Sequence, residues 1–292
     1  MANADLTQKF QAADGFELAY RHWEAAKTKR AVVCIHGIGD YSGWFRNIAP
    51  SLAANGSEVY ALDLRGFGES PEEGSPRGFV NDFGRHLQDI DDFVVYIRSC
   101  HKTRNLHMLG HSLGCVYSIW YAANHPQAVD SLVLAAPAVV STLHGSKKPV
   151  KSRFGKISAS KETYNLYFSL EARDRDPEEI KIMLADPLET WQLTSSYLSN
   201  IKKVLFKNLW KNVSLLKTPT LILQGGADTT AKPVGAKRLQ SKLGSIDKKL
   251  MIFPDAGHWL HDAFSPAPPR EKCDSEKREQ TIGAIIEWLK KH

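Results

Sequence analysis

The chain has 292 residues, of which 42% are hydrophobic, with a formal net charge of +6 and a pI near 9.0. This length and apolar content allow a substantial buried core, which excludes disorder as the main state. No apolar run approaches the roughly 20 residues of a membrane-spanning helix, and the start MANADLTQKF lacks the basic and apolar parts of a secretory signal. We therefore expect a cytoplasmic protein. Its basic residues form no single run with interleaved aromatic residues, so we expect no nucleic-acid partner.

The predicted elements alternate between short apolar strands and helices. A hairpin is expected first, around Asp14-Gly15. Further strands are expected, in chain order, at 30–36, 57–63, 105–110, 130–136, 218–225 and 248–254. Helices are expected at 44–54, 79–101, 113–124, 232–243 and 276–291. This alternation predicts an α/β fold with a parallel sheet covered on both faces.

The alternation is interrupted once, between 141 and 212, where no strand of comparable quality occurs. The apolar spacing within 195–210 and the acidic start after Pro177 predict helices there. This segment holds 13 Lys and Arg against 8 Asp and Glu, and so carries +5 of the net charge of +6. We therefore predict a core domain formed by 1–140 and 213–292, with a helical cap inserted at 141–212.

Ser112 lies in the pentapeptide GHSLG, between a predicted strand and a predicted helix. A serine hydroxyl needs a neighbouring base and an exposed position in order to act as a nucleophile. A sharp turn between a strand and a helix provides that position, and Gly110 and Gly114 provide the small residues that the close approach requires. A glycine-rich turn with a capping serine is the alternative interpretation.

Two backbone N–H groups are candidates for an oxyanion hole. The N–H of Leu113 lies at the positive end of the helix that follows Ser112. The N–H of Ile38 lies in HGIGD (36–40), directly after an earlier strand, and we call this segment the oxyanion loop. A phosphate-binding loop is disfavoured there, because the G-x-G-x-x-G spacing fails at Ser42.

His258 and Asp228 are the expected base and acid. His258 follows the strand KKLMIF through the turn PDAG, and Asp228 follows the strand LILQ through a Gly-Gly turn. Both positions are at carboxyl ends of strands, where active sites of open α/β folds are found. His261 is the rival base. Asp63 and Asp255 are the rival acids, and chain order and loop position favour Asp228 over both.

The motifs HGIGDYSGWF, ALDLRGFGES, GHSLG, LILQGGADTT and FPDAGHWLH follow the order found in one family. The sequence resembles the α/β-hydrolases, and within them the monoacylglycerol lipase and lysophospholipase-like branch, also called the serine aminopeptidase S33 group. The resemblance implies a mostly parallel eight-stranded sheet with helices on both faces and a cap. It also implies hydrolysis of carboxylic esters through an acyl-enzyme, with Ser112, Asp228 and His258 as the triad.

The expected substrate is a small acyl ester or a lipid. The candidates for its pocket are apolar residues near the oxyanion loop and in the cap, namely Trp44, Phe45, Leu166, Leu184, Leu198 and Leu205. No cofactor is expected and no metal, because a single H-x-x-H lacks the third protein ligand of a zinc site. The basic cap predicts peripheral contact with an anionic membrane surface, for which solvated lysines are the alternative. Other serine hydrolases of the same fold (short-chain esterases, thioesterases, C–C hydrolases and peptidases) and a non-catalytic receptor remain open alternatives.

Overall fold

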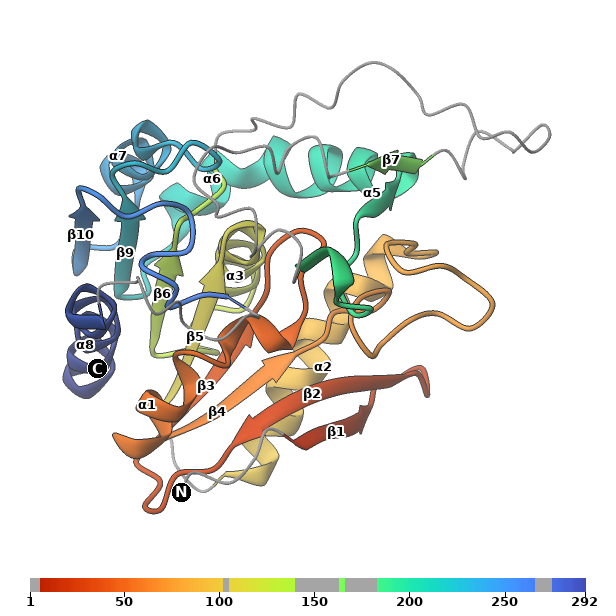
Figure 1. The fold of residues 1–292 in the computed structure, drawn as a ribbon, viewed down its shortest axis with the longest axis horizontal. Helices are drawn as coiled ribbons and strands as arrows, with labels where there is room; N and C mark the ends of the chain where they lie inside the picture. The colour runs from red at the N-terminus through yellow and green to blue at the C-terminus, as the bar shows by residue number, and fades with distance from the viewer. Residues whose placement is uncertain (1–5, 102–104, 140–162, 166–182, 266–274) are drawn as a thin grey trace.

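The computed structural model describes residues 6–101, 105–139, 163–165, 183–265 and 275–292. Its centre is one eight-stranded sheet in the order β1-β2-β4-β3-β5-β6-β9-β10 (Figure 1). The strands are β1 (Leu6–Gln11), β2 (Glu17–Trp23), β3 (Arg30–Ile35), β4 (Ser57–Leu62), β5 (Leu106–His111), β6 (Ser131–Ala135), β9 (Thr220–Gly225) and β10 (Lys248–Phe253). The pairings β1/β2 and β2/β4 are antiparallel, and the others are parallel. The predicted mostly parallel eight-stranded sheet is confirmed.

The central strands are buried on both faces, as near-continuous apolar runs predict. Alternate residues of β3 belong to two different core clusters: Val33 and Ile35 contribute to one, Val32 and Cys34 to the other. This is the two-residue period of a strand placed between two helical layers. The sheet is therefore a rigid base, and its carboxyl edge holds the loops in fixed positions.

Helices cover both faces of this sheet (Figure 1). They are α1 (Ala49–Ala54), α2 (Phe83–Cys100), α3 (Leu113–Asn124), α5 (Ser195–Asn200), α6 (Lys207–Leu215), α7 (Pro233–Lys242) and α8 (Ser275–Lys291). Helices α2, α3, α6 and α7 pack in the core cluster on one face, and α1 and α8 pack in the cluster on the other. The carboxylate of Asp82 caps α2 by accepting from the N–H groups of Gly84 and Arg85. This cap explains why α2 begins later than the predicted residue 79.

The prediction of one continuous helix at 44–54 is wrong. The structure instead has a 3₁₀ turn η1 (Ser42–Phe45) followed by the short helix α1. Pro50 lies in the first turn of α1, a position where a proline is tolerated because its missing N–H has no partner within the helix. The 3₁₀ turn η1 therefore separates the oxyanion loop from helix α1.

The segment predicted as a helical cap is not entirely helical. Two three-residue strands, β7 (Thr163–Asn165) and β8 (Gln192–Thr194), pair antiparallel within it. The predicted helix at 195–210 is present as α5, a π-helical segment η4 (Ile201–Phe206) and α6, which continues to Leu215. The last helix thus runs past the predicted boundary at 212. The acidic segment after Pro177 falls mainly outside the described residues.

Among the helices of the described residues, none combines the length and the apolar character that a membrane crossing requires.

Candidate active site

The nucleophile, base and acid predicted from the sequence lie together at the carboxyl edge of the sheet. Nε2 of His258 is 3.0 Å from Oγ of Ser112, and Nδ1 of His258 is 2.8 Å from Oδ2 of Asp228. All three residues are buried. When Nδ1–H donates to the carboxylate, Nε2 is left to accept the proton of the serine hydroxyl. This is the arrangement that turns a serine into a nucleophile.

The backbone of Ser112 has the strained conformation of a nucleophile elbow, with φ 56° and ψ −118°. A Cβ atom on Gly110 would lie 2.6 Å from the backbone N of Cys115, and one on Gly114 would lie 2.0 Å from the carbonyl O of Ile35. These approaches are too short for any side chain. The two glycines therefore allow β5 and α3 to pass close enough to present Ser112 at the tip of the turn.

Asp228 is held in place by several donors. Its Oδ1 accepts from the N–H groups of Thr230 at 2.8 Å and Ala231 at 2.7 Å, and its Oδ2 accepts from Nε2 of Gln224 at 3.2 Å. These bonds fix the carboxylate so that Oδ2 faces His258. The contribution of Gln224 was not anticipated from the sequence, although its place at the end of β9, four residues before Asp228, brings it within reach.

The rival acids make other contacts. Asp63 is fully buried and accepts from the N–H groups of Ser42 and Glu69. Asp255 has a side chain 54% exposed and pairs with Lys277. Asp63 supports the oxyanion loop, and Asp255 belongs to a surface turn.

The two predicted oxyanion donors flank the nucleophile. Leu113 is the first residue of α3, so its N–H has no acceptor within the helix. Ile38 follows Gly37, where an added Cβ would lie 3.1 Å from Cβ of Ser112. The loop that carries Ile38 is thus packed directly against the nucleophile.

His36 holds the start of this oxyanion loop. Its Nε2 accepts from the N–H of Leu64 at 3.1 Å, and its Nδ1 lies 2.8 Å from the carbonyl O of Gly37. Complete burial lowers the pKa of His36 to about 4, which keeps the ring neutral near pH 7. The neutral tautomer fits both bonds, because one nitrogen accepts and the other donates.

His111, inside the elbow, is a further part of the site that the sequence did not indicate. Its Nε2 lies 3.2 Å from the carbonyl O of His258. Its ring stacks on Phe264, with centroids 4.9 Å apart, and on Trp44 at 5.7 Å. His111 therefore connects the nucleophile elbow to the loop of the base and to the oxyanion loop.

The predicted pocket residues have different surroundings. Trp44, Phe45 and Leu205 are at most 1% exposed, and each belongs to a buried apolar cluster. Leu184 is 40% exposed, and Leu198 is half-buried against the core. Leu166 lies outside the described residues. Phe45 and Leu205 thus pack in the apolar core, and their place in a substrate pocket stays a prediction.

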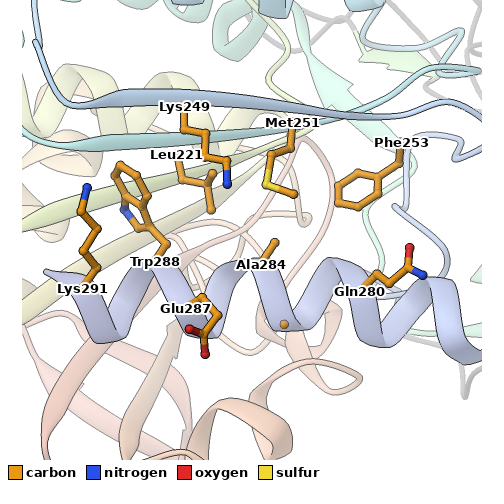
Figure 2. A pocket seen from close by; sticks show the side chains of 10 residues that line it. Leu221, Lys249, Met251, Phe253, Gln280, Ala284, Glu287, Trp288 and Lys291 are labelled. Carbon is orange, nitrogen blue, oxygen red and sulfur yellow. The ribbon is translucent and has the colours of Figure 1, made fainter.

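A cavity of about 720 Å³ lies away from the triad, between β10 and α8 (Figure 2). Leu221, Met251, Phe253 and Trp288 contribute to its apolar lining. No residue of the triad or of the two oxyanion donors lines it. The hydrogen-bonded geometry of Ser112, His258 and Asp228, and not this cavity, marks the candidate active site. Elsewhere, no three His, Cys, Asp or Glu side chains within the described ranges gather as a metal site would require.

Comparison with known proteins gives a consistent assignment. Residues 26–262 match the family described as serine aminopeptidase, S33. The chain is 28% identical over 288 residues to the monoacylglycerol lipase of Mycolicibacterium smegmatis. This alignment covers 97% of this chain and 96% of that protein. It is 30% identical over 267 residues to the human monoglyceride lipase, covering 85% of this chain and 82% of that protein.

Solved structures agree with this assignment. The monoacylglycerol lipase of Paleococcus ferrophilus superposes with a TM-score of 0.70 at 26% identity and covers 93% of this chain and 98% of its own. The monoglyceride lipase of Saccharomyces cerevisiae, with a substrate analogue bound, gives a TM-score of 0.76 at 18% identity, covering 100% of this chain and 96% of its own, a likeness of fold alone. The family match and the sheet topology lead to one conclusion: the chain belongs to the serine aminopeptidase S33 family and has the α/β-hydrolase fold.

Proposed function

We propose that the protein is a serine hydrolase that cleaves the ester bond of a monoacylglycerol through an acyl-enzyme. The observation that carries this proposal is the hydrogen-bonded chain from Ser112 through His258 to Asp228. The relatives described as monoacylglycerol lipases, which match over most of their own length, support the substrate class.

The reaction follows from the geometry. His258 takes the proton of Ser112 as Oγ attacks the ester carbonyl, and Asp228 stabilises the imidazolium that forms. The N–H groups of Ile38 and Leu113 bind the oxyanion of the tetrahedral intermediate. His258 then donates its proton to the departing alcohol, and a water molecule releases the acyl group by the same steps.

The charge next to the nucleophile favours a neutral head group. A Cβ atom on Gly37 would lie 2.3 Å from Oδ2 of Asp40 and 3.1 Å from Cβ of Ser112, so both side chains pack against Gly37. A carboxylate in this position accepts hydrogen bonds from glycerol hydroxyls and repels a phosphate. We therefore expect monoacylglycerol to be preferred over an anionic lysophospholipid.

The test compares substrates that share one acyl chain. Initial rates are measured with 1-oleoylglycerol and with 1-oleoylglycerol 3-phosphate, after a p-nitrophenyl ester series from C2 to C16 has defined the preferred chain length. We expect kcat/KM to peak at medium or long chains and to be at least tenfold higher for the neutral lipid. Asp40→Asn is expected to reduce the ratio of kcat/KM for the neutral lipid to kcat/KM for the phosphate. A peak at C2, or a preference for the phosphate, would contradict the proposal.

We further infer that the cap helix contacts anionic lipid surfaces. Lys202, Lys203, Lys207 and Lys211 are all exposed along η4 and α6. Each lysine near an anionic leaflet contributes about 1 kcal/mol of attraction. Co-sedimentation with phosphatidylserine vesicles is expected to be strong at low salt and lost at high salt. Replacing the four lysines by glutamine should abolish it while leaving hydrolysis of a soluble ester unchanged; salt-insensitive binding would contradict the inference.

A further inference from the structure

The end of the cap lies across the oxyanion loop and the η1 turn that follows it, and three hydrogen bonds join it to them. The N–H of Thr190 donates to the carbonyl O of Gly39 at 2.8 Å. The hydroxyl of Tyr41 donates to Oδ2 of Asp186 at 2.7 Å, and Nε1 of Trp44 donates to Oε1 of Glu189. One bond involves the main chain, and the other two end on carboxyl groups. Residues 186–190 of the cap therefore act as a clamp on the loop, and we call them the cap clamp.

The end of the cap clamp, Glu189 and Thr190, is buried against the loop that it holds. Tyr41, Trp44, Met183 and Trp259 form one buried apolar cluster, against which Leu188 and Trp191 pack. Glu189 is only 7% exposed. A carboxylate at such a position needs hydrogen-bond donors to offset its desolvation, and the indole N–H of Trp44 is one of them.

Trp44 connects the cap clamp to the catalytic residues. Its ring stacks on His111, the neighbour of Ser112, with centroids 5.7 Å apart. It also packs edge to face against Trp259, the neighbour of His258, at 5.5 Å. A displacement of Trp44 would therefore disturb the elbow, the loop of the base and the loop that carries Ile38.

We propose that Glu189 is a positioning residue, which holds Trp44 and thereby fixes the oxyanion loop for catalysis. This inference rests on the proposed function, because it concerns the transition state of the same reaction. Loss of the carboxylate would leave Nε1 of Trp44 buried without this acceptor. The loop would then relax, and the N–H of Ile38 would no longer meet the developing oxyanion. Misplacing one oxyanion donor lowers kcat by about 10²-fold.

The experiment uses Glu189→Ala and Glu189→Gln in the full chain, measured with the best p-nitrophenyl ester. We expect Glu189→Ala to lower kcat by 10- to 100-fold with KM changed by less than about threefold. Glu189→Gln keeps an oxygen acceptor and should recover most of the lost kcat. The second-order rate of labelling of Ser112 by a fluorophosphonate should fall in parallel, since that reaction also develops charge in the oxyanion hole.

A double-mutant cycle with Trp44→Phe separates positioning from general destabilisation. Phenylalanine lacks the indole N–H, so the effect of Glu189→Ala on kcat should largely disappear in this background. If Glu189→Ala fails to fold, Trp44→Phe alone should show the same fall in kcat. Additive effects in the cycle, or wild-type kcat in either single variant, would overturn the proposal.

Glu58→Ala is the matched control. Glu58 is also a buried glutamate that accepts hydrogen bonds, from His22, Thr28 and the N–H of Ala25, but it lies at the start of β4, at the opposite end of the sheet. The Glu58→Ala substitution should lower the melting temperature of the protein without lowering kcat. The proposed function is tested separately by the wild-type protein. If the wild type cleaves no ester, that proposal fails, and the labelling rates of the Glu189 variants still decide the inference about Glu189.

Discussion

Ser112→Ala is expected to lower kcat/KM for ester hydrolysis by about 10⁴-fold or more. In the proposed mechanism Oγ of Ser112 forms the acyl-enzyme, and no other hydroxyl is placed at 3.0 Å from Nε2 of His258 in the described contacts. Direct attack by water would have to replace it, without the proton transfer that this geometry provides. The measurement is initial-rate kinetics of the purified variant, together with loss of fluorophosphonate labelling.

Stability should change little in this variant. The substitution removes one hydroxyl and its bond to His258, which corresponds to about 1 kcal/mol or less in the free energy of unfolding. Ser118→Ala is the matched control, because Ser118 is buried in the same helix and its Oγ donates to the carbonyl O of Gly114 at 2.8 Å. That variant should keep wild-type kcat. Full activity in Ser112→Ala would show that the nucleophile is another residue.

The proximity of the three candidate triad residues could be predicted because each of them follows a strand that the sequence marks clearly. The apolar strands β5, β9 and β10 are parallel, so their carboxyl ends meet at one edge of the sheet. Ser112 stands directly after β5, and Asp228 and His258 follow β9 and β10 through short turns, so strand order places all three at this edge. Helix α3 was predicted with its observed ends for a related reason: Ser112 defines its start, and His125-Pro126 follows its last residue.

The cap clamp could not be predicted in this way. The bond between Trp44 and Glu189 joins residues 145 positions apart, and neither residue lies in a periodic pattern that fixes its partner. The strands β7 and β8 have only three residues each, too few for an alternating pattern to appear. Contacts of this kind depend on how two irregular segments pack, which local sequence patterns do not encode.

The second large effect is expected at Gly114, two residues after the nucleophile. Gly114→Ala would place a methyl group 2.0 Å from the carbonyl O of Ile35 and 2.7 Å from that of His36. Both atoms belong to the backbone at the end of β3 and the start of the oxyanion loop, so no side-chain rotation can relieve the clash. Helix α3 has to move away from the sheet. The cost should reach or exceed the upper end of the roughly 1–3 kcal/mol typical of overpacked cores.

Activity should fall together with stability in this variant, because Ser112 and the loop that carries Ile38 are pushed apart by the same methyl group. The matched control is Gly283→Ala, a glycine inside α8 with no atom within 4 Å of the added Cβ. Alanine is the better helix former by about 0.5–1 kcal/mol, so this variant should be slightly more stable and fully active.

Urea unfolding and ester kinetics on both glycine variants measure these effects. The comparison distinguishes a glycine that a close backbone approach requires, Gly114, from one in open space, Gly283. If Gly114→Ala were as stable and as active as the wild type, the close approach of α3 to β3 would not be needed to present Ser112. A stability loss in Gly114→Ala with unchanged kcat would mean that the elbow keeps its geometry while the helix behind it shifts. Loss of both follows if the glycine is required because the strand, the helix and the oxyanion loop meet at this one point.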